Sequence, residues 1–420
     1  MYQKTTLANG LRIVTCPMPH THSVSICFYL GAGSRYESDV QAGISHFIEH
    51  LCFRGTDKRN SAREISGAIE GVGGIINGGT DKELTVYWCK VARPHFQLAL
   101  DVLADMLLHS RIEEKDIEKE RRIIIEEISM SRDEPNQLVG MMLDELLWPD
   151  HPLGRDVAGT KQSVSKMTRK QMLDYMASEY SPGNTVISVA GNIQQDEVVT
   201  EINKILDKWD NRKARLDYLP YQELKNPRLK VERRETEQTH LCLALPGLSL
   251  QHPKRFTLDL MNVILGEGMS SRLFLEVRDK LGLAYNIHSY LDHFQDSGAL
   301  TVYAGVEPKN LEIGITAILE QLTLLKEKIS AEELTKAKEL SKGRLLLRME
   351  DSRSVAGWVG GQEILNGNIM DVEEVVSIID AITVDEMRSL AQELLIGDKL
   401  RLSVVGPVKS EDNLEKLLKI

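Results

Sequence analysis

The chain has 420 residues, 42% of them hydrophobic, and a formal net charge of −11. This length exceeds what one ordinary hydrophobic core supports, so we expect two domains of about 200 residues each. The acidic balance argues against nucleic-acid binding, and no segment has the roughly 18 uninterrupted apolar residues that a membrane helix needs.

Two further features of the sequence concern the environment of the protein. The N-terminal residues, from Met1 to Thr6, lack the apolar run of a secretory signal, which predicts a cytoplasmic location. The five cysteines are an odd number without CxxC spacing. We therefore expect buried free thiols and neither a disulfide framework nor a thiolate metal site.

The first half of the chain predicts a strand followed by helices. Residues 25–30 form an apolar, strand-like run, and the apolar-periodic stretch 43–53 predicts a helix. Residues 94–109 and 113–131 follow as two further helical patterns. This order favours an α+β fold in which helices cover one face of a mostly antiparallel sheet.

The second half of the chain repeats the first at one constant shift in numbering, which aligns 188–191 with 403–406. The same shift also aligns Cys27 with Cys242, Thr168 with Thr383 and Met172 with Met387. Separated matches at one shift suggest a duplication, although short apolar strings also align by chance. The polar, proline-containing stretch 213–229 predicts a linker between domains 1–212 and 230–420, which we expect to be two homologous α/β sandwich halves.

His46, Glu49 and His50 form an HxxEH motif inside the predicted helix 43–53. Residues four apart share a helix face, so both imidazoles can bind one ion while Glu49 lies beside them. Neutral imidazoles suit Zn²⁺, and a catalytic zinc site has three protein ligands with a fourth position open for water. The ion lowers the pKa of that water toward about 7, and a nearby carboxylate takes its proton. Because chance could also place these residues on one helix, a third ligand is needed.

The predicted helix 113–131 offers four acidic candidates for the third ligand. They are Glu118, Glu120, Glu126 and Glu127, and spacing alone does not choose among them. Charge runs on helices are usually solvated faces, so each of the four is also explained as an ordinary surface residue.

The motif and its context resemble the family of pitrilysin, insulysin and mitochondrial processing peptidase. Members of that family carry HxxEH followed, after 76 intervening residues, by a ligand glutamate, and this spacing selects Glu127. The resemblance implies one Zn²⁺ per chain, held by His46, His50 and Glu127, with Glu49 as the general base. It also implies that Glu120, two helical turns before Glu127, is an auxiliary acidic residue near the metal; a solvent-facing charge is the alternative.

The glycine-rich stretch 73–80 resembles the strand with which the family pairs its peptide substrate. Asn77, Gly78 and Thr80 are then substrate-binding residues, because an exposed strand edge binds a peptide through main-chain hydrogen bonds. A glycine-rich turn into a hairpin explains the same residues without a substrate. Gly78 departs from the family, which usually has alanine at this position, and glycine loosens a strand.

The second half carries apolar residues where the first half has its metal motif. The shift that aligns the two halves places the three motif positions on Met261, Ile264 and Leu265. If the halves are copies, the second has lost the metal site, and the helix position can serve as ordinary core.

The second half nevertheless resembles the family at 266–274 and 277–285. Members use an arginine and a tyrosine seven residues apart to contact substrate, and these are Arg278 and Tyr285 here. Both side chains are good hydrogen-bond donors to a developing oxyanion. Without the family, the two would be explained as a surface charge and a strand residue.

The resemblance covers nearly the whole chain and implies a zinc-dependent endopeptidase that hydrolyses peptides or small unfolded proteins in an enclosed chamber. A processing peptidase that removes presequences is the alternative within the family. The resemblance also implies a partner subunit, either a second copy in a homodimer or an inactive homologue in a heterodimer. The intact His46, Glu49, His50 and Glu127 argue against a non-catalytic scaffold, since family members with that role have lost the motif. A protein for metal storage or sensing would not need a base beside an open coordination position.

Overall fold

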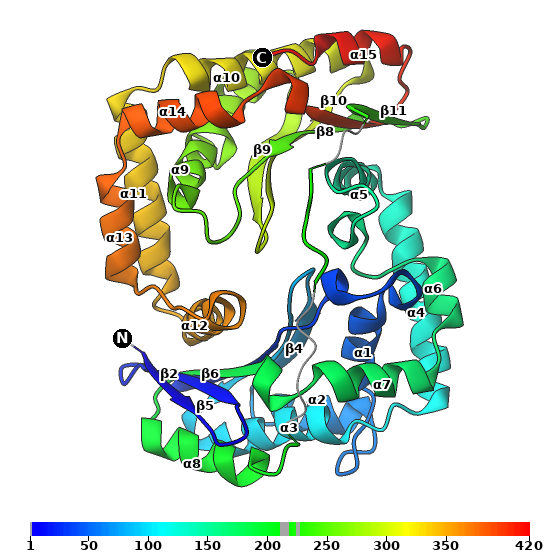
Figure 1. The fold of residues 1–420 in the computed structure, drawn as a ribbon, viewed down its shortest axis with the longest axis vertical. Helices are drawn as coiled ribbons and strands as arrows, with labels where there is room; N and C mark the ends of the chain where they lie inside the picture. The colour runs from blue at the N-terminus through cyan, green and yellow to red at the C-terminus, as the bar shows by residue number, and fades with distance from the viewer. Residues whose placement is uncertain (1, 211–217, 224–226) are drawn as a thin grey trace. The chain divides into compact units, whose positions relative to one another are not determined.

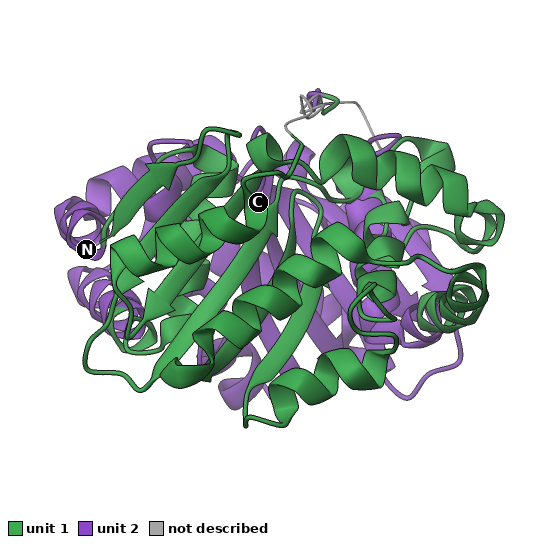
Figure 2. Cartoon of the chain, turned by 90° about the horizontal axis from the view of Figure 1, so that it is seen from below, with its two compact units in different colours: residues 1–129, 155–219, 346–371 green, residues 130–154, 220–345, 372–420 purple. Residues whose placement is uncertain are grey.

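The structure is a computed structural model that describes residues 2–210, 218–223 and 227–420 (Figure 1). The chain forms two compact units, which Figure 2 distinguishes by colour. Unit 1 comprises 1–129, 155–219 and 346–371, and unit 2 comprises 130–154, 220–345 and 372–420. Each unit therefore contains segments from both halves of the sequence.

Unit 1 is built on a six-stranded sheet in the order β1-β2-β6-β3-β5-β4. Neighbouring strands are antiparallel except for β2 and β6, which are parallel. Strand β4 lies at one edge, so its outer side has no partner among the described strands. The strands are β1 (Gln3–Thr6), β2 (Arg12–Pro17), β3 (Ser23–Leu30), β4 (Ile75–Thr80), β5 (Thr85–Ala92) and β6 (Thr185–Gly191).

Helices cover both faces of this sheet. The larger core joins one face to helices of the first half, with Ile26 and Phe28 of β3 packed in the same cluster as Phe47 and Leu103. The helices that belong to unit 1 are α1 (Ile44–Cys52), α2 (Ala62–Glu70), α3 (Phe96–His109), α4 (Glu114–Asp133), α6 (Lys161–Lys166), α7 (Arg169–Glu179), α8 (Gln195–Leu206) and α12 (Ser352–Asn366). The final turn of α4 already belongs to unit 2.

Unit 2 is built on a five-stranded sheet in the order β7-β11-β8-β10-β9, in which β7 and β11 are the parallel pair. Its strands are β7 (Leu229–Arg233), β8 (Thr239–Pro246), β9 (Ala284–His293), β10 (Gly298–Val306) and β11 (Arg401–Gly406). Its helices are α5 (Pro135–Leu147), α9 (Arg255–Gly266), α10 (Leu311–Glu327), α11 (Ala331–Arg348), α13 (Val372–Ala381), α14 (Val384–Leu394) and α15 (Glu411–Leu417), with a π-helix at Leu273–Lys280. The last residues of α11, from Leu346 on, belong to unit 1. The predicted α+β class with two homologous, mostly antiparallel sandwich halves is confirmed.

The two units have the same topology. The order β2-β6-β3-β5-β4 in unit 1 corresponds, strand by strand and in direction, to β7-β11-β8-β10-β9 in unit 2. Thr168 and Thr383, which the sequence shift aligned, are both N-caps with complete capping boxes, at α7 and α14. Met172 and Met387, one turn further on, are both fully buried. Equivalent residues therefore have equivalent structural roles in the two copies.

Two equivalent helices are exchanged between the halves of the sequence. Helix α12, from the second half, packs on the sheet of unit 1, where Ser188 Oγ donates to the carbonyl of Ala356 at 2.8 Å. Helix α5, from the first half, packs on the sheet of unit 2, where Ser403 Oγ donates to the carbonyl of Val139 at 2.7 Å. Ser188 and Ser403 are themselves equivalent positions in the alignment of the two halves.

The compact units thus depart from the sequential division 1–212 and 230–420, because α5 and α12 each bury their apolar face on the sheet of the other half. Part of the expected linker 213–229 lies outside the described residues. All five cysteines are buried and free, as expected. Among the helices in the described ranges, none combines the length and hydropathy needed to span a bilayer.

Helix α12 supplies a test of this exchange. A Cβ at Gly360 would fall 2.5 Å from Ser188 Oγ and 2.6 Å from the ring of Tyr29, whereas a Cβ at Gly361 would meet nothing within 4 Å. Gly360→Ala should therefore destabilise the protein by about 1–3 kcal/mol through overpacking. The matched Gly361→Ala should be neutral or stabilising by up to about 1 kcal/mol, because alanine favours helix more than glycine. Denaturant unfolding followed by circular dichroism measures both, and equal effects would contradict the packing of α12 on this sheet.

Candidate metal centre

Helix α1 is fixed at its start by a glycine and a buried carboxylate. Gly43, the N-cap, has φ of 92°, and a Cβ there would lie 2.4 Å from the carbonyl oxygen of Ala158. The carboxylate of Glu37 accepts from the backbone N–H groups of Gly43 at 2.7 Å and Ser45 at 2.9 Å. These bonds satisfy donors that a helix N-terminus otherwise leaves unpaired.

The two faces of α1 differ in character. Ile44, Phe47, Ile48 and Leu51 are buried in the core of unit 1, so the helix cannot rotate about its axis without exposing them. His46 and His50, one turn apart, lie on the half-buried face. The apolar stripe of α1 therefore determines the direction of both imidazoles.

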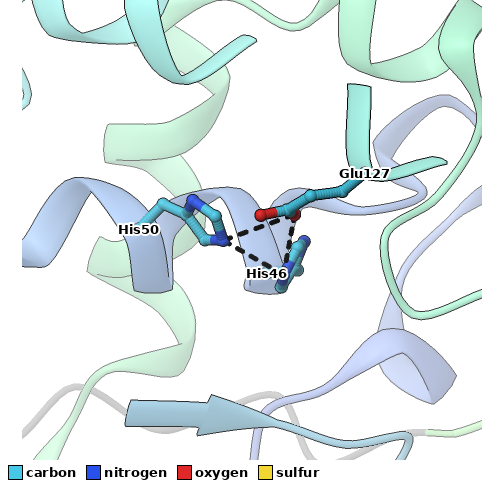
Figure 3. Close-up of side chains that lie close together, drawn as sticks. All are labelled: His46, His50 and Glu127. Atoms are coloured by element: carbon cyan, nitrogen blue, oxygen red, sulfur yellow. Dashed lines mark hydrogen bonds and ion pairs between the residues drawn. The ribbon is translucent and has the colours of Figure 1, made fainter. Parts of the chain in front are cut away.

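Helix α4 brings the third group to the two histidines. Its apolar stripe of Ile117, Ile124 and Ile128 is buried in the same core. Glu127 lies on α4 beside this stripe with its side chain 42% exposed. Figure 3 shows its carboxylate directed toward both imidazoles.

The distances suit a single tetrahedral ion. His46 Nε2 and His50 Nε2 are 3.2 Å apart, and Glu127 Oε2 is 3.9 Å and 3.7 Å from them, respectively. Ligands at about 2.0–2.1 Å from a tetrahedral zinc ion are separated by about 3.3–3.4 Å. All three ligand atoms lie within 4.8 Å of one another, and these residues form the one such group of three found in the described ranges. The donor set of two imidazoles and a carboxylate fits zinc.

Glu120 contacts His50 from helix α4. It is almost fully buried, and its Oε2 lies 3.0 Å from His50 Nδ1. Its other oxygen, Oε1, forms an ion pair with Arg54. A carboxylate at Nδ1 holds the proton on that nitrogen, so that Nε2 keeps its lone pair for a metal. The solvent-facing alternative for Glu120 is wrong, because α4 buries this side chain against α1.

Protonation of the two histidines follows from the same environment. Burial, together with the neighbouring His50, lowers the pKa of His46 to about 4. Burial also acts to lower the pKa of His50, but the hydrogen bond with Glu120 and the charges of Glu127 and Glu49 raise it overall. His46 is therefore neutral near pH 7, which is the form that binds a metal.

Glu49 lies on α1 directly before His50 and points to strand β4. Thr80 Oγ1 donates to Glu49 Oε2 at 2.7 Å. Burial raises the pKa of Glu49, and the hydrogen bond from Thr80 opposes this change. Glu49 lies on the helix that carries two of the candidate ligands and is not itself part of the group of three, which is the position that a general base needs.

The glycine-rich stretch forms the edge strand that the resemblance predicted. Asn77, Gly78 and Thr80 all lie in β4, which pairs with β5 and leaves its outer edge open among the described strands. Asn77 Oδ1 accepts from the N–H of Gly78 at 2.8 Å. The hairpin and the open edge are both present, so the two interpretations of this stretch do not exclude each other.

Arg278 and Tyr285 lie together in unit 2. Arg278 belongs to the π-helix and Tyr285 to β9, and the guanidinium carbon lies 5.2 Å from the centre of the tyrosine ring. Tyr285 is 77% exposed. The two side chains therefore contact each other and Tyr285 is accessible, while their contact with substrate stays a prediction.

In unit 2, the residues equivalent to the HxxEH motif belong to the hydrophobic core. Met261, Ile264 and Leu265 lie on α9 and are buried. The alignment of the two halves places Lys342 at the position of Glu127, where it forms ion pairs with Glu339 and Asp380. Unit 2 therefore has none of the metal ligands at these positions.

Two residues near the metal group were not expected from the sequence. Arg54 follows His50 by four residues, so helical spacing was a usable signal for its place beside Glu120. Glu37 precedes α1 by seven residues, and nothing in its local sequence distinguishes it from a surface acid.

Comparison with known families agrees with this geometry. The profile described as "Insulinase (Peptidase family M16)" matches residues 12–161, and the profile described as "Peptidase M16 inactive domain" matches residues 166–341. A Bacillus subtilis protein named an uncharacterized zinc protease is 37% identical, over 97% of this chain and 98% of its own length. The chain belongs to the M16 peptidase family. A Mycobacterium leprae protein, also named an uncharacterized zinc protease, is 38% identical over 99% of this chain and 94% of its own length.

Solved structures show the same M16 fold at lower identity. A protease from Helicobacter pylori superposes with a TM-score of 0.89 at 23% identity, covering 97% of this chain and 99% of that one. A Pseudomonas fluorescens structure described as a peptidase M16 inactive domain has a TM-score of 0.90 at 20% identity, covering 97% and 99%. A chain of Complex III2 from Candida albicans has a TM-score of 0.84 at 19% identity and full coverage of both. The fold is thus shared by a protease, an inactive M16 domain and a chain of Complex III2.

The metal centre leads to a binding prediction. After zinc-replete expression, the wild-type M16 protein should contain about one zinc per chain, and His46→Ala or His50→Ala should lose it. Glu120→Gln should keep the ligands but weaken zinc affinity by roughly 10- to 100-fold, because it removes the carboxylate that orients His50. Mass-spectrometric metal analysis and competition with a chelating dye measure these effects. Wild-type protein without stoichiometric zinc would contradict the assignment.

Proposed function

We propose that the chain is a zinc-dependent endopeptidase that hydrolyses peptides or small unfolded proteins. One observation carries this proposal: Glu49, a base held by a hydrogen bond, lies on the same helix as the two imidazoles of a three-ligand group. The names of the M16 relatives as zinc proteases support it.

The ligands proposed for zinc are His46, His50 and Glu127. When bound, zinc polarises a water molecule and the scissile carbonyl, which makes the water a stronger acid and the carbonyl a better electrophile. Glu49 takes a proton from the attacking water as the new C–O bond forms. Glu49 then gives that proton to the leaving amine as the peptide C–N bond breaks. Burial raises the pKa of Glu49, which makes its carboxylate a better proton acceptor.

The substrate is proposed to bind as an added strand along β4. The open edge of β4 offers backbone N–H and C=O groups, and its glycines place little side-chain bulk along it. Main-chain pairing binds extended peptides with little dependence on sequence. Extended chain is what unfolded proteins and free peptides supply, and this is the basis for proposing an endopeptidase with broad specificity.

Arg278 and Tyr285 are proposed to contact the substrate and to donate to the carbonyl oxygen as it gains charge. The support is the contact between the two side chains and the exposure of Tyr285, together with the family resemblance. An enclosed chamber and a partner subunit, either a second copy or an inactive homologue, are proposals that rest on that resemblance alone. Size-exclusion chromatography with light scattering, run beside a peptide-library digest, addresses assembly and cleavage preference together.

The role of Glu49 has a direct test. Glu49→Gln should keep stoichiometric zinc but lose peptidase activity by at least about 100-fold, because glutamine cannot accept the proton. Glu127→Gln is the matched variant, since it makes the same chemical change at a ligand and should lose zinc as well. Turnover of quenched fluorescent peptides and metal analysis give both results. Near wild-type turnover in Glu49→Gln would rule out its role as base.

Tyr285 has a separate test. Tyr285→Phe should leave folding and zinc content intact while lowering kcat at least as much as it raises KM. Loss of one oxyanion donor typically costs about 100- to 1000-fold in turnover. Steady-state kinetics on several peptides measure the two constants. Unchanged kinetics on all of them would remove Tyr285 from the mechanism.

A further inference from the structure

The edge strand β4 has one face that contacts helix α1. Side chains of a strand alternate between its two sides, so Ile76, Gly78 and Thr80 share a face. Ile76 packs against the core cluster that contains the apolar side of α1. The other two inward positions both lie beside the carboxyl group of Glu49.

The two oxygens of Glu49 have different neighbours on this face. Oε2 accepts the hydrogen bond from Thr80 Oγ1 at 2.7 Å. Oε1 and Cγ lie 3.1 Å from the point where a Cβ of Gly78 would stand, and the ring of Phe53 lies 3.0 Å from that point. Thr80 therefore holds one end of the carboxylate, and the other end lies beside Gly78 and Phe53.

We propose that β4 positions the general base in addition to binding substrate. Thr80 is a positioning residue whose hydrogen bond fixes the orientation of Glu49. This inference rests on the proposed function of Glu49 as base. A glutamate has three side-chain torsions, and without a partner its carboxylate would spend time away from the reactive orientation.

Strand β4 contacts both the proposed base and the place where the substrate is proposed to bind. The inward face of β4 touches Glu49, while the outer edge of the same strand is open for a peptide. The register of a peptide along β4 would therefore also set the peptide bond that faces Glu49. Catalytic groups need placement to within about 0.5 Å, and a misplacement of about 1 Å can cost roughly 100-fold in rate.

Threonine at position 80 can be tested with two substitutions. Thr80→Val keeps the branched shape and removes the donor, so kcat should fall by roughly 10- to 100-fold while KM changes by less than about threefold. Thr80→Ser keeps the donor and should restore kcat to within a few-fold of wild type. Zinc content and melting temperature should stay close to wild type in both variants.

A structural measurement accompanies the kinetics. In metal-free crystals, the carboxylate of Glu49 should turn away from position 80 in Thr80→Val and stay in place in Thr80→Ser. Wild-type kcat in Thr80→Val, or a loss of kcat that serine does not restore, would overturn the role of Thr80. If instead the wild-type protein shows no zinc-dependent peptide cleavage, the proposed function fails, and the crystal comparison still decides whether Thr80 orients Glu49.

Discussion

The candidate site depends on the contact between α1 and α4 that the buried carboxylate of Glu120 maintains. Glu120 reaches from α4 to His50 Nδ1 and to Arg54, both at the end of α1 or just beyond it. A buried carboxylate is costly unless it is paired and hydrogen-bonded, so any shift of α4 along α1 would leave this charge without partners. Glu127 follows Glu120 by two helical turns on the same side of α4. The bond that orients one histidine therefore also sets the position of the carboxylate that completes the metal group.

Helical periodicity alone was enough to predict that His46 and His50 lie side by side. The i, i+4 spacing of His46 and His50 required only that 43–53 be helical, and the apolar residues between them made that helix evident. The choice among Glu118, Glu120, Glu126 and Glu127 could not be made in this way, because it depends on how far α4 is displaced along α1. The hydrogen bond from Thr80 to Glu49 could not be predicted either, because the two residues are 31 positions apart and contact each other only when α1 packs beside strand β4.

The fold class and the duplication were predictable, but the exchange of helices was not. Strands that match at one constant shift in numbering indicate a duplication. The sheet on which a helix packs depends instead on three-dimensional contacts, which the periodicity of the sequence does not reveal. The two copies also show what the metal group requires of its surroundings. Where unit 1 keeps imidazoles and acids on a half-buried face, unit 2 has Met261, Ile264 and Leu265 in ordinary core. Helix α9 consequently needs no compensating partners of the kind that Glu120 and Arg54 provide.

The exchanged helices also determine when the protein can finish folding during synthesis. The sheet of unit 1 is complete once β6 ends at Gly191, yet the helix that covers its second face ends at Asn366. A ribosome must therefore add the whole stretch between these two positions before Tyr29 and its apolar neighbours on that face are covered. During that interval the nascent chain exposes one side of a sheet, which is the kind of surface that aggregates or recruits chaperones. The three grouped residues end at Glu127 and the core that positions them extends to Leu206, so a metal site at this group would be assembled before the covering helix is synthesised.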